Sequence, residues 1–169
     1  RDHSAWIEEF RACDRIEYER VVRRAIRPDG GRIRMGEAVD AVARAYDNDA
    51  VLVTDVGQQQ MNAARYFGFR RTRSVVTSGG LGTMGFGLPA AIGAKLGAPD
   101  REVVLFAGDG GLQMTIQELG TIFQSKIPVK IVLLNNSFLG MVRQWQKVFY
   151  ENRFSSTDPH RKTDLVKLA

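Results

Sequence analysis

This chain has few of the residues that carry the commonest covalent and redox chemistries. Its 169 residues include one cysteine, Cys13, and two histidines, His3 and His160. A single cysteine excludes an internal disulfide and fits a reducing compartment. Because the histidines lie near opposite ends of the chain, the sequence predicts neither a histidine metal cluster nor a serine-histidine triad, and it predicts a surface position for both.

Long apolar runs are absent as well. No stretch of about 18 apolar residues occurs, and the first residues lack the charged-then-apolar order of a signal peptide. No G-x-S-x-G or P-loop string is present. We therefore expect a soluble protein with no membrane partner, in the cytoplasm of a bacterium or in an organelle of a eukaryote.

The net charge of +5 first suggests nucleic acid as a partner. Much of the arginine, however, lies in residues 11–34 and alternates with acidic residues, which predicts a solvated helix face. A second cluster, Arg70, Arg71 and Arg73, is flanked by two phenylalanines. No nucleic-acid-binding motif accompanies it, so we expect no nucleic-acid partner.

The apolar residues form short runs that alternate with segments of helical periodicity. With 44% hydrophobic residues, the chain is able to bury a substantial core. Continuous apolar strands separated by helices predict an α/β fold, a three-layer parallel sheet with helices on both faces. The predicted strands are residues 51–53, 75–76, 103–107 and 129–134, and the predicted helices are residues 4–27, 35–46, 59–66, 87–95, 112–124 and 139–149.

Residues 1–34 are predicted to be a linker helix and connector from a preceding domain. Trp6, Phe10 and Cys13 recur there at helical spacing, so we expect this helix to pack against another element. Residues 28–32 break the helix and form the one convincing linker. Residues 35–169 are predicted to form a truncated carboxyl-terminal domain, and the helix-like residues 164–169 suggest a piece of a longer protein.

Three of the predicted strands are followed by polar or glycine-rich turns. These turns are residues 54–57, Gly108-Asp109-Gly110 and Asn135-Asn136, and 24 residues separate the second turn from the third. In an open parallel sheet, ligands bind beyond the carboxyl ends of the strands. Glycines let a diphosphate approach the backbone, and carboxylate and amide oxygens suit a hard cation. The pairing therefore predicts a metal-bridged diphosphate site.

Plainer interpretations exist for each part of this site. Asp109 is placed to cap the following helix, and paired asparagines are typical of a polar turn. Residues 80–85, GLGTMG, fit the dinucleotide pattern G-x-G-x-x-G. The acidic residue about 20 positions on, Asp100, lies in a turn rather than at a strand end, and these glycines also suit close packing of a helix on the sheet. Met141 and Trp145, four apart, suit one apolar helix face in the core.

The spacing from Gly108-Asp109-Gly110 to Asn135-Asn136 resembles the thiamine diphosphate motif. Around it, residues 55–61, 78–85 and 139–146 resemble the catalytic large subunit of acetolactate synthase, also called acetohydroxyacid synthase. The resemblance covers about residues 35–169. It implies the thiamine diphosphate-binding fold of the carboxyl-terminal domain of that enzyme.

The resemblance also implies roles for individual residues. Mg²⁺ would be held by the Asp109 carboxylate, the Asn136 side-chain oxygen and the Phe138 carbonyl oxygen. Gly82 would offer its carbonyl to the aminopyrimidine of the cofactor and Met84 would hold the cofactor bent, which makes these two the implied catalytic residues. The implied cofactor-binding set is Val56, Gly57, Gln58, Gln59, Gly82, Met84, Gly108, Asp109, Gly110, Gly111, Asn136, Phe138, Leu139, Gly140 and Met141.

The implied activity is that of a transferase in branched-chain amino acid biosynthesis. Pyruvate would be decarboxylated on thiamine diphosphate, and its two-carbon unit joined to pyruvate or 2-ketobutyrate. Met141 and Trp145 would line the pocket of this second 2-ketoacid, where the indole limits its size. The full-length protein would be a homodimer or tetramer with FAD in another domain and a small regulatory subunit.

Two positions depart from the family's pattern, and other classes stay open. Gln59 stands where histidine is common and Asn62 where an aromatic residue is frequent; the glutamine amide still offers phosphate a hydrogen-bond donor. A pyruvate oxidase or 2-ketoacid decarboxylase would share the metal motif without the Met141 to Trp145 constellation. A dinucleotide-binding dehydrogenase domain would bind NADH, and a non-enzymatic assembly fragment would not respond to thiamine diphosphate.

We predict that the purified 169-residue chain forms no acetolactate. By resemblance, the glutamate that activates the cofactor belongs to the amino-terminal domain of a partner subunit, and the flavin-binding domain lies outside this segment. A colorimetric assay with pyruvate, thiamine diphosphate and Mg²⁺ measures this. Acetolactate formation above that of a protein-free control would contradict the prediction.

Overall fold

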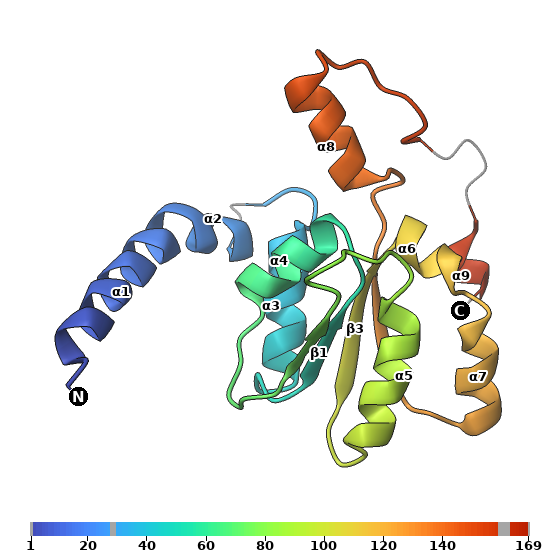
Figure 1. Cartoon of the computed structure of the whole chain (residues 1–169), viewed down its shortest axis with the longest axis horizontal. Coiled ribbons are helices and arrows are strands. Elements are labelled where there is room, and N and C mark those ends of the chain that lie inside the picture. Colours follow the sequence, from blue (N-terminus) through green and yellow to red (C-terminus); the bar gives the residue numbers. More distant parts are fainter. Residues whose placement is uncertain (1, 28–29, 159–162, 169) are drawn as a thin grey trace.

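The structure is a computed structural model of the 169-residue chain. It describes residues 2–27, 30–158 and 163–168. Two features of the sequence, the Pro28-Asp29 part of the linker and His160, lie outside the described residues. Figure 1 shows a central sheet with helices on both sides, a helix that projects at the amino-terminal end, and another that stands above the sheet.

A parallel sheet of four strands forms the centre of the molecule. The strands are β1 (Val51–Thr54), β2 (Val75–Thr77), β3 (Val103–Gly108) and β4 (Lys130–Leu134). Their order is β2-β1-β3-β4, and each neighbouring pair is parallel. All residues of β1 and β3 are buried, whereas β2 and β4 at the edges are partly exposed. The strands predicted from the apolar runs are confirmed, and their carboxyl ends share one edge.

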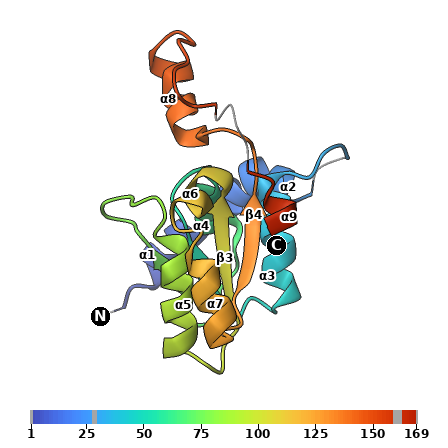
Figure 2. The same ribbon diagram turned by 90° about the vertical axis from the view of Figure 1, so that its right-hand side faces the viewer.

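Helices cover both faces of this sheet, which confirms the predicted three-layer α/β fold (Figure 1, Figure 2). Side chains alternate between the two faces along a strand. Leu52 and Phe106 pack on one face under α3 and α4, and Val53 and Leu105 pack on the other under α5 and α7. The bounds of these helices are α3 (Met35–Ala45), α4 (Gln58–Tyr66), α5 (Gly87–Gly97) and α7 (Glu118–Ser125).

One predicted helix is wrong in its extent. In place of a single helix over residues 112–124, the chain forms α6 (Asp109–Met114) and then α7. The break lies at Thr115, whose hydroxyl donates a hydrogen bond to the Gly85 carbonyl oxygen at 3.0 Å. A threonine side chain that bonds to a backbone group competes with the helical hydrogen bonds. Contact with the neighbouring loop therefore overrides the helical periodicity of the sequence.

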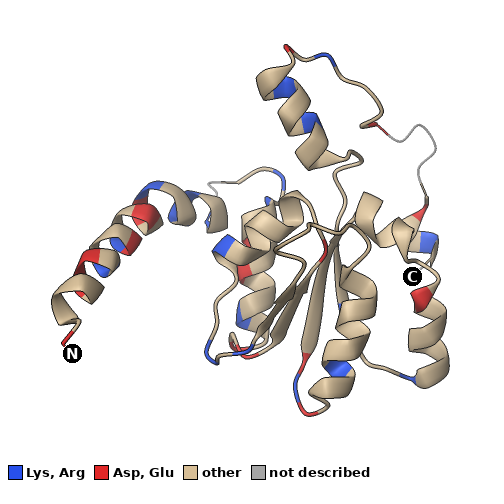
Figure 3. Ribbon diagram, viewed as in Figure 1, with Lys and Arg blue, Asp and Glu red and all other residues tan. Residues whose placement is uncertain are grey.

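The amino-terminal segment is helical but projects from the body of the molecule (Figure 1). It consists of α1 (Ser4–Glu17), a π-helical turn (Tyr18–Val22) and α2 (Arg23–Ile26). Its charges pair with one another at the surface, as Arg15 does with Glu8, so the predicted solvated face is confirmed (Figure 3). Among the described residues, no element covers the three side chains expected to pack: Trp6 and Phe10 are 60% and 55% exposed and meet edge to face, and Cys13 is exposed.

Two helices complete the chain. α8 (Gly140–Phe149) stands above the carboxyl edge of the sheet (Figure 2). Leu165 of the short α9 (Leu165–Leu168) packs against the core cluster that contains Leu88 of α5. None of the helices in the described part of the chain is long and apolar enough to cross a membrane.

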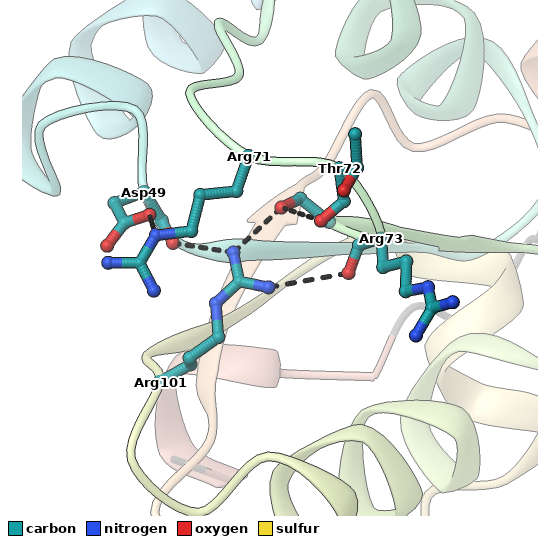
Figure 4. A network of polar contacts seen from close by, with 6 residues as sticks. Asp49, Arg71, Thr72, Arg73 and Arg101 are labelled. Atoms are coloured by element: carbon teal, nitrogen blue, oxygen red, sulfur yellow. Dashed lines mark hydrogen bonds and ion pairs between the residues drawn. The ribbon is translucent and has the colours of Figure 1, made fainter.

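The amino-terminal edge of the sheet is held by a network around Arg101 (Figure 4). The guanidinium donates hydrogen bonds to the Asp49 carbonyl oxygen at 2.8 Å, the Ser74 hydroxyl at 2.7 Å and the Arg73 carbonyl oxygen at 3.3 Å. Arg71 Nε lies 2.8 Å from Asp49 Oδ1. These acceptors precede β1 and β2, and Arg101 itself precedes β3. One side chain therefore aligns the starts of three strands.

This network explains the second arginine cluster, which first suggested nucleic acid. Arg71 is engaged by Asp49, and the Arg73 backbone is engaged by Arg101. Phe67, which flanks the cluster in sequence, is buried and lies edge-to-face with Phe106 in the core. The interleaved arginines and aromatics therefore belong to the fold.

We predict that Phe106→Ala lowers the free energy of unfolding by about 3–5 kcal/mol, because a large fully buried side chain is lost and a cavity is left. Phe106 is 0% exposed. Phe123→Ala is the matched control, since Phe123 on α7 is 84% exposed; its effect is expected to stay within about 0.5 kcal/mol. Urea unfolding measures both variants, and similar values for the two would contradict this account of the core.

Candidate functional site

The carboxyl edge of the sheet carries a hollow of about 180 Å³. Its lining contains every residue of the cofactor-binding set that the resemblance implies, and in addition Leu134 and Val142. These two were missed because an apolar residue at a strand end or in a helix has no sequence signal of its own. The hollow therefore brings together residues from four separate parts of the chain.

The fold explains how these parts meet. Three of them are the turns that follow β1, β3 and β4, and parallel strands bring such turns to one edge. Each turn leads directly into a helix, α4, α6 or α8, so backbone N–H groups without helical partners lie at this edge. The fourth part is the loop between β2 and α5, which supplies Gly82 and Met84.

Asp55 holds this loop to the end of β1. Its side chain is 1% exposed and accepts hydrogen bonds from the backbone N–H groups of Val56 at 2.7 Å, Gly85 at 3.2 Å and Gly87 at 2.8 Å. A carboxylate bonded to several N–H groups is stabilised without a cation. The sequence analysis placed Asp55 at a strand end without predicting a structural role for it. The signal that could have indicated this role is an acidic residue directly after a fully apolar strand.

Two glycines of the turn after β3 lie close to side chains of other segments. A Cβ atom on Gly111 would collide with the Asp55 carboxylate, and one on Gly110 would lie 2.7 Å from Leu139 Cδ2. A side chain at Gly111 would displace the buried Asp55 carboxylate from the bonds that hold the loop, whereas one at Gly110 would require the Leu139 side chain to move. Gly111 is therefore a packing requirement of the fold.

Asp109 is placed differently from Asp55. It is 7% exposed, and no described residue donates a hydrogen bond to its carboxylate or forms an ion pair with it. The capping interpretation is wrong, because Gly108 is the N-cap of α6 and no side-chain capping bond is present. A carboxylate that opens into the hollow and has no donor among the described residues is suited to bind a cation.

The asparagines form a polar turn, and Asn136 also faces the hollow. Asn135 Oδ1 accepts the Ser137 N–H at 2.9 Å, and Asn136 Oδ1 accepts the Phe138 N–H at 3.0 Å. Because an amide oxygen has two lone pairs, Asn136 keeps one for another ligand. The polar-turn interpretation is thus confirmed, and it leaves room for metal binding by Asn136.

Side-chain amides connect the turn after β1 with the turn after β4. Asn136 Nδ2 donates to Gln58 Oε1 at 3.3 Å, and Gln58 Nε2 donates to Gln144 Oε1 on α8 at 3.1 Å. Gln59 is buried, and its Nε2 donates to the Val56 carbonyl oxygen at 2.8 Å. One of the two N–H bonds of that amide is therefore committed to the protein.

The charge of the hollow is one-sided. Its described lining includes Asp109 and no lysine, arginine or histidine. No group of three histidine, cysteine or acidic side chains is found in the described ranges, so a metal here depends on amide and carbonyl oxygens beside Asp109. An anionic ligand therefore needs a bound cation to offset its repulsion from Asp109.

The structure also places the residues of the competing interpretations. Gly82 and Gly85 have φ of +61° and +86°, so the GLGTMG string forms left-handed turns before α5 begins. Asp100 lies between α5 and β3, at the opposite edge of the sheet from the hollow. α8 has no buried residue, so Met141 and Trp145 are not core residues. Met141 lines the hollow, whereas Trp145 is 58% exposed and is not in the lining.

A parallel α/β sheet with glycine-rich turns at its carboxyl edge is the arrangement of a domain that binds a phosphorylated ligand. Residues 55–169 match the family model described as thiamine pyrophosphate enzyme, C-terminal TPP binding domain. The chain belongs to this family. Thiamine pyrophosphate is another name for thiamine diphosphate, the cofactor that the motif spacing indicated.

Curated relatives share the acetolactate synthase name. The chain is 52% identical over 130 residues to the acetolactate synthase large subunit of Lactococcus lactis, covering 77% of this chain and 23% of that protein. It is 43% identical over 169 residues to the acetolactate synthase isozyme 3 large subunit of Escherichia coli, covering 100% of this chain and 28% of that protein. The chain thus spans about a quarter of the length of these relatives.

A solved structure has the same fold. It is a thiamine diphosphate-dependent 4-hydroxybenzoylformate decarboxylase of Rhodococcus jostii RHA1, with a TM-score of 0.72 and 30% sequence identity. The match covers 79% of this chain and 25% of that chain. The likeness confirms the thiamine diphosphate-binding fold expected from the sequence.

We predict that Gly111→Ala destabilises the chain by about 1–3 kcal/mol, because the new methyl group meets the buried Asp55 carboxylate. Gly120→Ala on α7 is the matched control, since nothing lies within 4 Å of the added Cβ. Alanine is the better helix former there, so this control is expected to gain about 0.5–1 kcal/mol. Chemical unfolding compares the two, and a Gly111→Ala variant as stable as the parent chain would refute the close approach.

Proposed function

We propose that this chain is the cofactor domain of an acetolactate synthase, a transferase of branched-chain amino acid biosynthesis that serves the isoleucine and valine branches. In this proposal the whole enzyme decarboxylates pyruvate and joins the two-carbon unit to pyruvate or 2-ketobutyrate. The names of the relatives support the reaction. The observation that carries the proposal is Asp109, a nearly buried carboxylate without a described partner, in a hollow whose described lining has no basic residue.

This charge pattern fits a diphosphate that arrives with a divalent cation. A diphosphate alone would be repelled by Asp109, and nothing basic in the described lining would offset that repulsion. Mg²⁺ prefers oxygen ligands and keeps some of its ligands from phosphate and water. Asp109, the Asn136 side-chain oxygen and the Phe138 carbonyl oxygen are the proposed protein ligands.

The remaining residues would hold the cofactor in place. When bound, thiamine diphosphate supplies an electron sink for the carbanion formed as a 2-ketoacid loses carbon dioxide. The backbone around Gly57 and Gly110 would receive the diphosphate end. Gly82 and Met84, on the loop that Asp55 holds, would contact the organic end. The N–H bonds from Gly85 and Gly87 to Asp55 hold this loop without a ligand.

The pocket for the second 2-ketoacid would lie along α8. Met141 lines the hollow, and Trp145 lies one turn further along the same helix, stacked on Phe149 with ring centroids 4.8 Å apart. An indole fixed in this way would limit the size of the second substrate. A 2-ketoacid decarboxylase remains the second candidate, because the solved relative carries that name at 30% identity.

The size of the hollow supports a site completed by other parts of a longer protein. Its volume of about 180 Å³ is below the roughly 300–1,000 Å³ of most ligand pockets. A homodimer or tetramer, FAD in another domain and a small regulatory subunit belong to this proposal. So do a cytoplasmic location in a bacterium or an organellar one in a eukaryote, and the absence of nucleic-acid and membrane partners.

We predict that the chain binds thiamine diphosphate weakly and only with Mg²⁺, and that Asp109→Asn lowers the affinity at least about tenfold, because the anionic metal ligand is lost. Isothermal titration calorimetry measures the affinity with and without Mg²⁺. Tight binding by the chain alone would contradict the expectation that other domains complete the pocket.

Asp100→Asn is the matched control. Its carboxylate lies at the opposite edge of the sheet, so binding of thiamine diphosphate is expected to stay unchanged. If the chain were a dinucleotide-binding domain, it would bind NADH and Asp109→Asn would leave that binding intact. Metal-independent binding of thiamine diphosphate, or full affinity in Asp109→Asn, would overturn the proposed site.

A further inference from the structure

We propose that a second hollow, beside α8, binds a small oxyanion, the carboxylate or phosphate group of a metabolite. This hollow has a volume of about 290 Å³, close to the lower end of ordinary ligand pockets at roughly 300 Å³. The residues that carry the argument are Arg143, Lys147, Gln58, Gln144, Phe138 and Phe154. The proposal goes beyond the thiamine diphosphate site and needs neither that cofactor nor a metal.

Arg143 lies against two aromatic rings. Its Cζ atom lies 4.3 Å from the ring centroid of Phe138 and 3.9 Å from that of Phe154. Both distances are well inside the range of cation–π contacts. Contact with two rings restricts the guanidinium, whose N–H donors form a planar fork. Within the described ranges, no residue accepts a hydrogen bond from these N–H groups or forms an ion pair with them.

The second ring is itself tied to α8. Gln146 Nε2 donates to the Ser155 carbonyl oxygen at 2.9 Å, and Gln146 Oε1 accepts the Ser155 N–H at 3.2 Å. Ser155 follows Phe154 directly, so these two bonds fix the backbone next to that ring. Arg143 therefore has its planar fork of donors oriented before a ligand arrives, which is the arrangement that recognises carboxylate and phosphate.

The other polar groups of the hollow are cationic or neutral. Lys147 lies four residues after Arg143, so the two side chains share one face of α8. It has no ion-pair partner in the described part of the chain. α8 carries blue segments and no red one in Figure 3. Gln58 and Gln144 supply amides that suit hydrogen bonding to an oxyanion, and their mutual bond holds them in place.

The two hollows share a wall but differ in charge. Gln58, Asn136, Phe138 and Gly140 line both of them. The first hollow contains Asp109 and no described basic residue, so it requires a cation with its ligand. The second contains Arg143 and Lys147 and no acidic residue in its described lining. An oxyanion free of metal is therefore expected in the second hollow, one layer of side chains from the first.

The test is a titration of the 169-residue chain in EDTA with pyruvate and, separately, with inorganic phosphate, at constant ionic strength. NMR follows the Arg143 Nε–Hε signal and the side-chain amides of Gln58 and Gln144. We expect saturable shifts for at least one anion. Arg143→Gln is expected to weaken binding at least about tenfold, because charge-assisted bonds to the fork are lost. Lys147→Gln is expected to weaken it several-fold.

Matched variants separate a site from a general effect of charge. Arg20→Gln removes one positive charge from the exposed π-helical turn and should leave both affinities unchanged. Arg143→Lys keeps a cation between the rings without the planar fork, and it should bind more tightly than Arg143→Gln and less tightly than the parent chain. Stronger binding of pyruvate would identify a carboxylate ligand, and stronger binding of phosphate a phosphorylated one.

Three results would overturn the proposal: no saturable shift with either anion, equal affinity in Arg143→Gln, or equal loss in Arg20→Gln. If Arg143→Gln changes the unfolding midpoint, Lys147→Gln decides, and unchanged affinity in that variant counts against the site. The titration contains no metal and no cofactor. Its outcome is therefore independent of Asp109 and of thiamine diphosphate binding.

Discussion

The arrangement of the cofactor hollow depends on one buried carboxylate, that of Asp55. It joins the end of β1 to the loop before α5 and to the first residue of α5 through the backbone N–H groups of Gly85 and Gly87, and it also accepts the N–H of its own neighbour Val56. The same oxygens occupy the space that a side chain at Gly111 would need, and the backbone and Cβ of Asp55 crowd Gly87. The turns after β1 and β3 and the loop with Gly82 and Met84 are thus positioned by a single group.

Asp55 and Asp109 lie at the same edge of the sheet but have different roles, because their surroundings differ. Asp55 has its charge satisfied by N–H groups, and it stabilises the fold without a ligand. Asp109 lacks such donors among the described residues, so the fold leaves a charge that a bound cation would neutralise. Arg143 is the positive counterpart, with its donors oriented by two rings. The charges of Asp109 and Arg143 have no hydrogen-bond or ion-pair partner among the described residues, so both groups are available to ligands at this edge.

The sequence predicted the sheet and the edge at which the polar turns gather because both follow from strong local signals. Apolar runs such as residues 103–107 have a clear length and clear ends, and parallel strands bring their turns together. The break at Thr115 was not predictable, since it depends on a bond to Gly85, 30 residues away. Three other features were also not predictable, because they depend on whether segments distant in sequence touch. They are the exposure of Trp6, the hydrogen bonds of Asp55 and the contact of Arg143 with two rings.

Gln59 shows how one departure from the family's pattern changes the chemistry of the hollow. A histidine at this position would add a group that titrates near neutral pH, and its charge would help to hold phosphate as the pH falls. The glutamine amide is neutral throughout, and it already donates one N–H to the Val56 carbonyl oxygen. Its remaining N–H is a neutral donor of modest strength. In the proposed site, attraction for a diphosphate would then rest on a cation at Asp109 and on backbone N–H groups, which would make the cation the controlling element.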